Sequence, residues 1–202
     1  MNPPDRLSNP TNMAEEPRMS DVSRDDLDGV RSGDPDAWRA FVRRHEDVVA
    51  ATVIGMIGRG PEAEDIGQEV FIRFFRNVHS FRGHASVSTY LTRSAINLSL
   101  NAIKRRQRMR RWFAGPPVDV HESRDPNPAE RAEQRDLSDS VARAIRRLKP
   151  DYRAVVVLRL VRGLSTSAAA KALGIPEGTV MSRLSRAQVQ LRKQLQGVMA
   201  DG

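Results

Sequence analysis

Apolar residues recur at helical spacing along most of this chain, and the breaks in that pattern divide it into two blocks. The first block covers about 24–111 and is interrupted at 58–61 and 81–84, where Gly, Pro and polar residues gather. The second covers about 129–196. The sequence has no internal repeat of the kind that builds a solenoid. The pattern therefore predicts an all-α chain.

Helix starts are marked by capping residues. Asp34 is placed to cap a helix whose first residue is Pro35. After the break at 58–61, acidic residues fill the first turn of the next helix, where the helix dipole favours negative charge. A loop at 81–84 precedes a long helix over about 88–111.

Composition shifts at both ends of the first block suggest the domain plan. Residues 1–23 are rich in Pro, Asn, Ser and acids and are predicted to be disordered. Residues 113–128 have the Pro and polar bias of a flexible linker. We therefore expect two small helical domains, a helical bundle over 24–112 and a helix-turn-helix domain over 129–197.

The helix-turn-helix is predicted over 165–184. Ser165 can cap its first helix, Gly174 stands where the backbone must leave the helix, and Pro176 suits the first turn of the second helix. One face of that second helix is apolar, through Val180, Leu184, Ala187 and Leu191. The opposite face carries Met181, Ser182, Ser185 and Arg186 near the end that enters a DNA major groove. An ordinary helical hairpin packed in a core is the alternative.

The charge distribution favours a polyanionic partner. The formal net charge is +8, and the first 28 residues hold seven acids and three bases, which leaves +12 on the other 174. A basic folded body with an acidic tail is typical of nucleic-acid binding. A membrane surface is the alternative, but no helix clearly pairs a basic face with one rich in Trp, Phe and Leu.

A second candidate nucleic-acid surface lies on the long helix over 88–111. Six basic residues without an acid occupy its end: Lys104, Arg105, Arg106, Arg108, Arg110 and Arg111. Upstream, Tyr90, Arg93, Asn97 and Asn101 share one face at 3.6 residues per turn. An aromatic ring, amides and cations on one face suit unpaired bases, which stack, form hydrogen bonds and carry phosphates. A solvated helix end is the alternative.

Sequence features of catalysis are weak. The four histidines, His45, His79, His84 and His121, have no zinc-ligand spacing with a partner. The carboxylates over 62–69 are better explained as an acidic helix start than as a metal site. We expect no enzymatic activity, no metal and no cofactor. The absence of cysteine, of a signal pattern and of a membrane-spanning apolar run predicts a soluble, cytoplasmic protein.

Taken together, these segments resemble the extracytoplasmic-function sigma factors of bacterial RNA polymerase. The resemblance covers about 24–112 and 129–195 and rests on the order and spacing of several motifs. They are 63–71, 81–83, 89–98 and the basic run in the first domain, and 148–159, 163–165 and 178–187 in the second.

The resemblance implies a role for each matched position. Asp65, Gln68, Glu69 and Phe71 would dock on the clamp of the polymerase largest subunit. The −10 promoter element would be captured by the loop at 81–87, with Phe81 and Arg82, and by Tyr90, Arg93, Asn97, Asn101 and Arg105. The −35 element would be read by Thr179, Met181, Ser182, Ser185 and Arg186.

Further partners implied by the resemblance are the flap of the second-largest subunit and an anti-sigma factor. The chain departs from the family where Tyr90 replaces a usual Trp and Asn101 a usual Asp. Ala168, Met181 and Ser185 also replace residues that the family commonly has polar or bulky. The rival functions are a stand-alone helix-turn-helix transcriptional regulator and a nucleic-acid-processing enzyme.

Overall fold

The computed structural model describes residues 24–83, 85–113 and 132–200, which form helices joined by short turns. No β-strand occurs within these ranges, and the predicted all-α class is confirmed. The predicted tail over 1–23 and residues 114–128 of the predicted linker lie outside the described residues. None of the helices in the described part of the chain is long and apolar enough to cross a membrane.

The N-terminal half forms a helical bundle built around a long central helix. Its elements are α1 (Arg24–Arg31), α2 (Pro35–Ile57), α3 (Pro61–Asn77), the 3₁₀ turn η1 (Val78–Ser80) and α4 (Val87–Phe113). The predicted cap is confirmed, because the Asp34 carboxylate accepts a hydrogen bond from the Asp36 amide at 2.8 Å. Helix α4 extends two residues beyond the predicted end at 111, a common discrepancy at helix termini.

Aromatic rings fasten α2 to α3. The Phe41 and Phe74 rings stack with their centroids 4.7 Å apart. Trp38 stacks on Phe41 at 5.5 Å and meets the edge of Phe71 at 6.3 Å. Such pairs add to the stabilisation that burial of the rings provides. The bundle therefore fixes which face of α3 points outward.

The C-terminal half contains the predicted helix-turn-helix. Its elements are α5 (Ala132–Arg147), α6 (Pro150–Val156), the π-helical segment η2 (Val157–Val161), α7 (Thr166–Leu173) and α8 (Glu177–Ala200). The Ser165 hydroxyl accepts a hydrogen bond from the Ala168 amide at 3.1 Å and caps α7. Gly174 ends α7 with φ 65° and ψ 35°, the left-handed conformation that glycine tolerates best. Both sequence predictions are confirmed.

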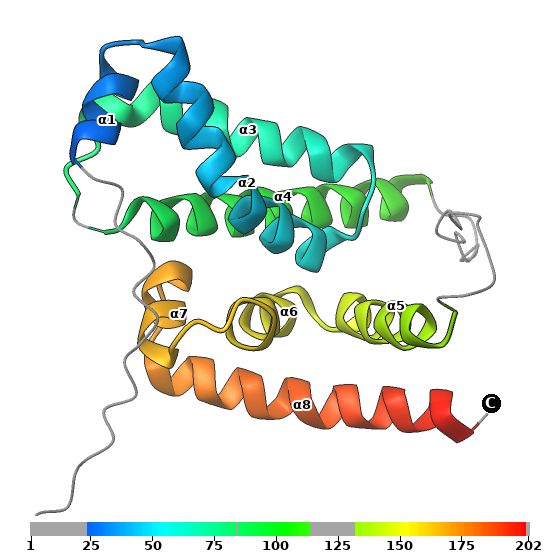
Figure 1. Cartoon of the computed structure of the whole chain (residues 1–202). Coiled ribbons are helices and arrows are strands. Elements are labelled where there is room, and N and C mark those ends of the chain that lie inside the picture. The colour runs from blue at the N-terminus through cyan, green and yellow to red at the C-terminus, as the bar shows by residue number, and fades with distance from the viewer. Residues whose placement is uncertain (1–23, 84, 114–131, 201–202) are drawn as a thin grey trace, which may run out of the picture.

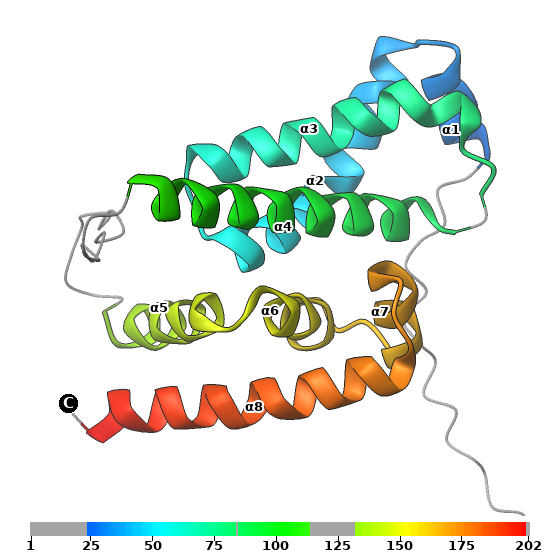
Figure 2. The same ribbon diagram turned by 180° about the vertical axis from the view of Figure 1, so that it is seen from behind.

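The two halves lie one above the other as two tiers, as Figures 1 and 2 show from opposite sides. Buried residues of both tiers belong to a single continuous apolar cluster. Helix α2 packs against α5, α6 and η2, and α4 packs against α6 and α7. At Gly55 of α2, an added Cβ would lie 3.0 Å and 3.1 Å from the two terminal methyl carbons of Val157. Glycine at this position therefore permits a close approach of the two tiers.

A buried arginine links the tiers through polar bonds. The Arg153 guanidinium of α6 donates to the Met56 carbonyl of α2 at 2.5 Å and to the Leu148 carbonyl at 3.2 Å. It also donates to the carbonyl of Arg146. Burial lowers the pKa of the Arg162 guanidinium, and the negative charge of Asp47 on α2 opposes that shift. A cation of the lower tier, Arg153, thus binds a backbone carbonyl of the upper tier.

Replacing Arg153 by Met should lower the free energy of unfolding by about 2–4 kcal/mol, because it leaves buried carbonyl groups without a donor. Urea denaturation measures this change. Arg147→Met is the control. It removes an exposed guanidinium from the end of α5 and should change the free energy of unfolding by no more than about 0.5 kcal/mol. Equal effects of the two variants would contradict a structural role for the buried Arg153 bonds.

Candidate nucleic-acid interface

The outer face of α4 carries the predicted base-reading residues. Arg93, Asn97 and Asn101 are all exposed. The opposite side of the helix is buried, through residues that include Leu91, Ala95, Ile96 and Ala102. The predicted shared face is therefore confirmed, and its three polar side chains are accessible to a ligand that lies along the helix.

Tyr90 begins this face but is held partly inside the bundle. Its ring lies edge-on to Phe74 at 5.6 Å and to Phe81 at 5.8 Å. Phe81 in turn lies edge-on to Phe74 at 5.7 Å. Both predicted aromatic residues are half-buried, so their orientations are fixed before any ligand binds. A base that stacks here would meet a ring whose orientation is already fixed, which lowers the entropic cost of binding.

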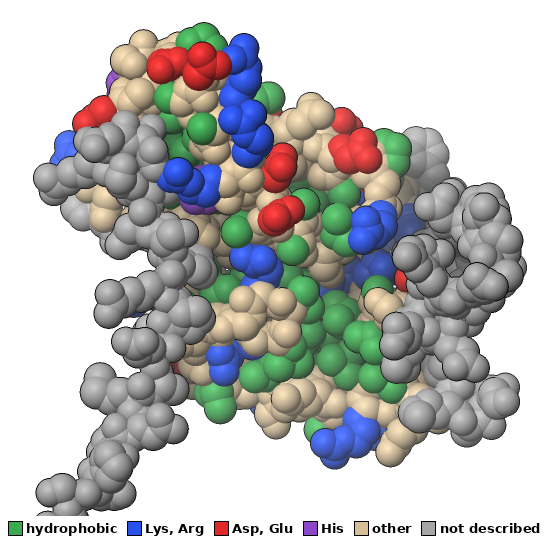
Figure 3. All heavy atoms as spheres, in the orientation of Figure 1, with side chains coloured by type: hydrophobic (Ala, Val, Ile, Leu, Met, Phe, Trp, Pro, Cys, Tyr) green, Lys and Arg blue, Asp and Glu red, His purple; other side chains and the backbone are tan. Residues whose placement is uncertain are grey.

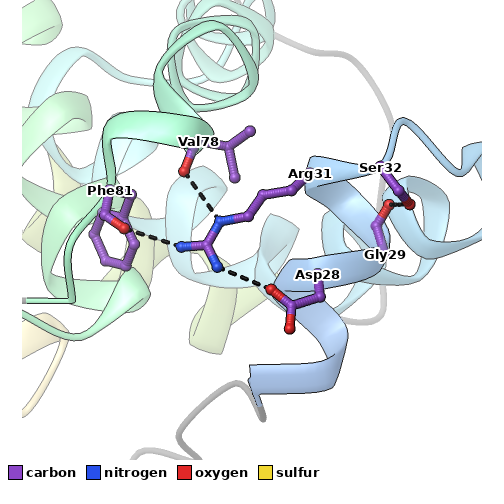
Figure 4. A network of polar contacts seen from close by, with 6 residues as sticks. All are labelled: Asp28, Gly29, Arg31, Ser32, Val78 and Phe81. Atoms are coloured by element: carbon purple, nitrogen blue, oxygen red, sulfur yellow. Dashed lines mark hydrogen bonds and ion pairs between the residues drawn. The ribbon is translucent and has the colours of Figure 1, made fainter.

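The loop after η1 is anchored by an arginine from α1, the first helix of the bundle. Figure 4 shows the Arg31 guanidinium of α1 between Asp28 and two carbonyl groups. It donates to the Phe81 carbonyl at 3.0 Å and the Val78 carbonyl at 3.5 Å, and it pairs with Asp28 at 2.9 Å. Arg82 then projects into solvent, while His84 lies outside the described residues. At the other end of the loop, the Ser86 hydroxyl accepts from the Thr89 amide at 3.1 Å.

The basic end of α4 is exposed, but two of its arginines are occupied. Glu62, at the start of α3, pairs with Arg105 at 2.8 Å and also with Arg106. A phosphate that binds Arg105, one of the predicted −10 contacts, must compete with that carboxylate. Trp112 is 86 % exposed at the same end, which the sequence analysis did not single out. An aromatic residue directly after a run of cations was the signal that could have drawn attention to it.

The outer face of α3 agrees only partly with the predicted docking set. Asp65 and Gln68 are exposed, and Glu69 is half-buried and paired with Arg73 at 2.6 Å. Phe71, however, is only 9 % exposed and packs into the aromatic core, so it does not reach the surface. The exposed apolar residues are Ile72 and Phe75, at 42 % and 45 %. Ile72 follows Glu69 by three residues, Gln68 by four and Asp65 by seven, and this helical spacing would have placed it on the same face.

The N-terminal part of α8 presents the predicted reading face to solvent. Met181, Ser182, Ser185 and Arg186 are exposed, and Thr179 is half-buried. The Ser182 hydroxyl donates to the Thr179 carbonyl at 3.1 Å, and the Thr166 hydroxyl donates to the Met181 sulfur at 3.6 Å. The helix is fixed from below, because Val180, Leu184 and Ala187 are buried as predicted.

An ion pair and an apolar patch are further features of the lower tier. Arg183 of α8 pairs with Asp151 of α6 at 3.2 Å. Hydrophobic side chains gather over the lower tier, around α5, α6 and α8, on the face shown in Figure 3. An apolar surface of this kind suits a protein partner better than a nucleic acid.

Comparison with protein families assigns each half separately. Residues 41–109 match the model of sigma-70 region 2, which covers most of the upper tier. Residues 138–191 match the model of sigma-70 region 4, which includes the helix-turn-helix.

Full-length relatives match across both halves. The chain is 33 % identical over 175 residues to the ECF RNA polymerase sigma factor SigW of Bacillus subtilis, with 82 % of this chain and 92 % of the relative covered. It is 35 % identical over 159 residues to the ECF RNA polymerase sigma factor SigE of Mycolicibacterium smegmatis, with 79 % of this chain covered. The chain spans 62 % of the length of that SigE.

Solved structures share the fold. The sigma factor RpoE of Bartonella quintana, in complex with the anti-sigma factor NepR, aligns with a TM-score of 0.64 and 25 % identity. That alignment covers 78 % of this chain and 96 % of the RpoE chain. CnrH, in complex with the cytosolic domain of CnrY, aligns with a TM-score of 0.64 and 22 % identity over 86 % of this chain and 97 % of that one.

The contrast between Phe71 and Ile72 on α3 is directly testable. Phe71→Ala should lower the free energy of unfolding by about 3–5 kcal/mol, because it removes a buried ring from the aromatic core. Ile72→Ala should change stability by about 0.5 kcal/mol or less, because that side chain is largely exposed. Thermal and urea unfolding measure both. A larger loss for Ile72→Ala would contradict the described orientation of α3.

Proposed function

The chain belongs to the extracytoplasmic-function sigma factors of the sigma-70 family and is an alternative sigma factor for transcription initiation; we propose that α3, α4 and α8 carry its three binding surfaces. In this proposal α3 docks on core RNA polymerase, α4 reads the −10 promoter element and α8 reads the −35 element. The observation that supports the assignment most strongly is that both family regions occur in one chain, each with an exposed polar helix face.

The proposed −10 reader works on single-stranded bases. Arg93, Asn97 and Asn101 supply donors and acceptors along the exposed face of α4, and the half-buried Tyr90 supplies an aromatic ring. Because these groups bind unpaired bases better than paired ones, binding shifts the duplex equilibrium towards the open form. Opening therefore requires no catalysis from this chain, and we infer that it acts by binding alone.

The basic end of α4 would hold the phosphates beyond the −10 bases. Arg108, Arg110 and Arg111 are exposed there, and no acidic residue occurs in the run from Lys104 to Arg111. Each phosphate that is neutralised releases counterions, so this contact makes promoter binding weaken as salt rises. Trp112, next to these cations, offers a flat apolar surface to the same nucleic acid.

The proposed −35 reader has few polar side chains that can discriminate between bases. Arg186 is the one cation in the predicted set, and Met181 contributes apolar contact. Arg can bind guanine through two hydrogen bonds, and Met can only contact apolar groups such as the thymine methyl. We therefore propose that Arg186 carries the largest share of specificity at this element.

Protein partners are assigned to the remaining surfaces. The exposed face of α3, with Asp65, Gln68 and Ile72, would dock on the clamp of the largest polymerase subunit. The apolar face of the lower tier would meet the flap of the second-largest subunit. The Bartonella quintana RpoE structure contains an anti-sigma factor, and we propose that a protein of that class also binds this chain in the cytoplasm.

Run-off transcription with core polymerase and no other sigma factor tests the proposal. We expect promoter-dependent transcripts only when this protein is added. A stand-alone helix-turn-helix regulator would bind DNA but give no transcript with core alone, and that result would refute the assignment.

The charge-reversed variant Asp65→Lys should reduce core binding while leaving binding to an isolated −35 fragment intact.

DNA binding by a variant of Arg186 tests the proposed role of this residue at the −35 element. Arg186→Ala should weaken binding to a −35 duplex by about 1–3 kcal/mol and reduce discrimination against mutated duplexes. Lys193→Ala is the matched control, because Lys193 is exposed two turns further along the same helix. It should weaken all duplexes alike. Fluorescence anisotropy on matched and mutated duplexes measures both effects, and unchanged discrimination in Arg186→Ala would remove Arg186 from the reading face.

A further inference from the structure

We propose that Arg31 of α1 is a positioning residue for the −10 reader: it fixes the backbone at Phe81 and thereby orients Tyr90, the aromatic residue that meets unpaired bases. This inference rests on the function proposed above, because it concerns how the −10 reader is prepared for its bases. Arg31 lies on α1, outside the three proposed binding surfaces, so its effect on the bases is indirect.

Helix α1 is held firmly against the bundle at the residues just before Arg31. Val30 is 1 % exposed, and α1 packs on α2 and on η1. A Cβ placed on Gly29 would lie 2.7 Å from the Ala37 Cβ, so glycine permits α1 to approach α2 closely. The last turn of α1 is therefore fixed, and from it the Arg31 side chain points towards the segment after α3 (Figure 4).

The carbonyl groups that Arg31 binds lie at the end of a helical segment, where a helix runs out of amide donors of its own. Val78 begins η1, and Phe81 follows η1 with extended backbone angles. The guanidinium donates to the Phe81 carbonyl at 3.0 Å and to the Val78 carbonyl at 3.5 Å. The shorter bond is the stronger one, so Arg31 acts mainly on Phe81.

Phe81 carries this constraint to the proposed base-reading residues. Its ring lies edge-on to Phe74 at 5.7 Å and to Tyr90 at 5.8 Å. Arg31 therefore holds the backbone of Phe81 while Phe74 holds its ring, and Tyr90 packs against a neighbour that cannot turn away. The Phe81 carbonyl also shares a planar peptide group with the Arg82 amide, so the same bond sets the direction in which the chain enters Arg82.

The energies involved separate positioning from folding. The ion pair between Arg31 and Asp28 is 33 % and 66 % exposed, and such pairs contribute little to stability. The bond from the guanidinium to the Phe81 carbonyl is stronger, because its donor is charged. Since the Arg31 side chain is one-third exposed, water can replace it at that carbonyl when it is removed. The protein then still folds, but the entropic cost of ordering Phe81 falls on DNA binding.

The variant Arg31→Met tests this inference, and Arg39→Met is its matched control. Arg31→Met removes the donor to the Phe81 carbonyl and keeps an unbranched side chain. Arg39→Met removes a guanidinium from an ion pair of the same spacing, with Asp36, and leaves the bond to Phe81 in place. Arg31→Lys keeps a cation that can donate to a carbonyl, so it should restore part of any loss.

Holoenzymes made from core polymerase and each variant are titrated with forked promoter DNA whose −10 bases are already unpaired. Matched and substituted −10 sequences are compared, because the ratio of their affinities measures base reading. We expect Arg31→Met to weaken binding to the matched fork about ten-fold and to lower that ratio by a similar factor. Core binding, and binding of the free protein to a −35 duplex, should stay within about two-fold of wild type, as should every property of Arg39→Met.

Two results would overturn the inference. One is an unchanged preference for the matched −10 sequence in Arg31→Met. The other is an equal loss of −10, −35 and core binding, which would show a general structural role. Absence of any −10 preference in the wild-type holoenzyme would instead refute the proposed −10 reader itself, so the two failures are distinguishable.

A double variant tests the route through Tyr90. Tyr90→Leu removes the stacking ring and keeps an apolar side chain beside Phe81. In that background we expect Arg31→Met to lower the −10 preference by less than about three-fold, because residues that act as a unit have non-additive effects. An undiminished loss of about ten-fold would show that Arg31 acts independently of Tyr90 and would overturn the proposed route.

Discussion

The contact between α2 and the α6–η2 segment joins the two tiers of the molecule, and the placement of its surfaces depends on it. It brings the backbone of Gly55 against the side chain of Val157 and seals the Arg153 guanidinium between carbonyl groups of both tiers. Because the buried residues of the two tiers form one cluster, the N-terminal bundle and the helix-turn-helix domain pack as a single body.

The proposed reading faces of α4 and α8 both lie exposed on this single body. Either face is therefore accessible to nucleic acid. At the basic end of α4, the carboxylate of Glu62 competes with phosphates for Arg105 and Arg106.

Local features of the sequence predicted the local structure well. The cap at Asp34, the cap at Ser165 and the left-handed Gly174 follow from residue chemistry over three or four positions, and the structure confirms all three. The exposed face of α4 followed from helical spacing in the same way.

Features that depend on tertiary contacts were harder to predict. Phe71 was expected at the docking surface, but the rings of Trp38 and Phe41 draw it into the core, and Ile72 takes the exposed place. Gly55 and Arg153 carried no local signal, because a glycine in an apolar helix and an arginine after a Pro-Asp-Tyr start have many ordinary explanations. The packing of the tiers could therefore not be inferred from patterns within either half.

The promoter positions that α4 and α8 contact are the most direct test of this account. A photo-crosslinker can be attached at Asn97→Cys in α4 or at Ser185→Cys in α8, because both residues are exposed and the chain has no cysteine of its own. In a transcribing complex with core polymerase, we expect the probe on α4 to crosslink to unpaired bases of the −10 element and the probe on α8 to crosslink to the −35 duplex. Crosslinks from both probes to the same element, or to no promoter DNA, would contradict the account.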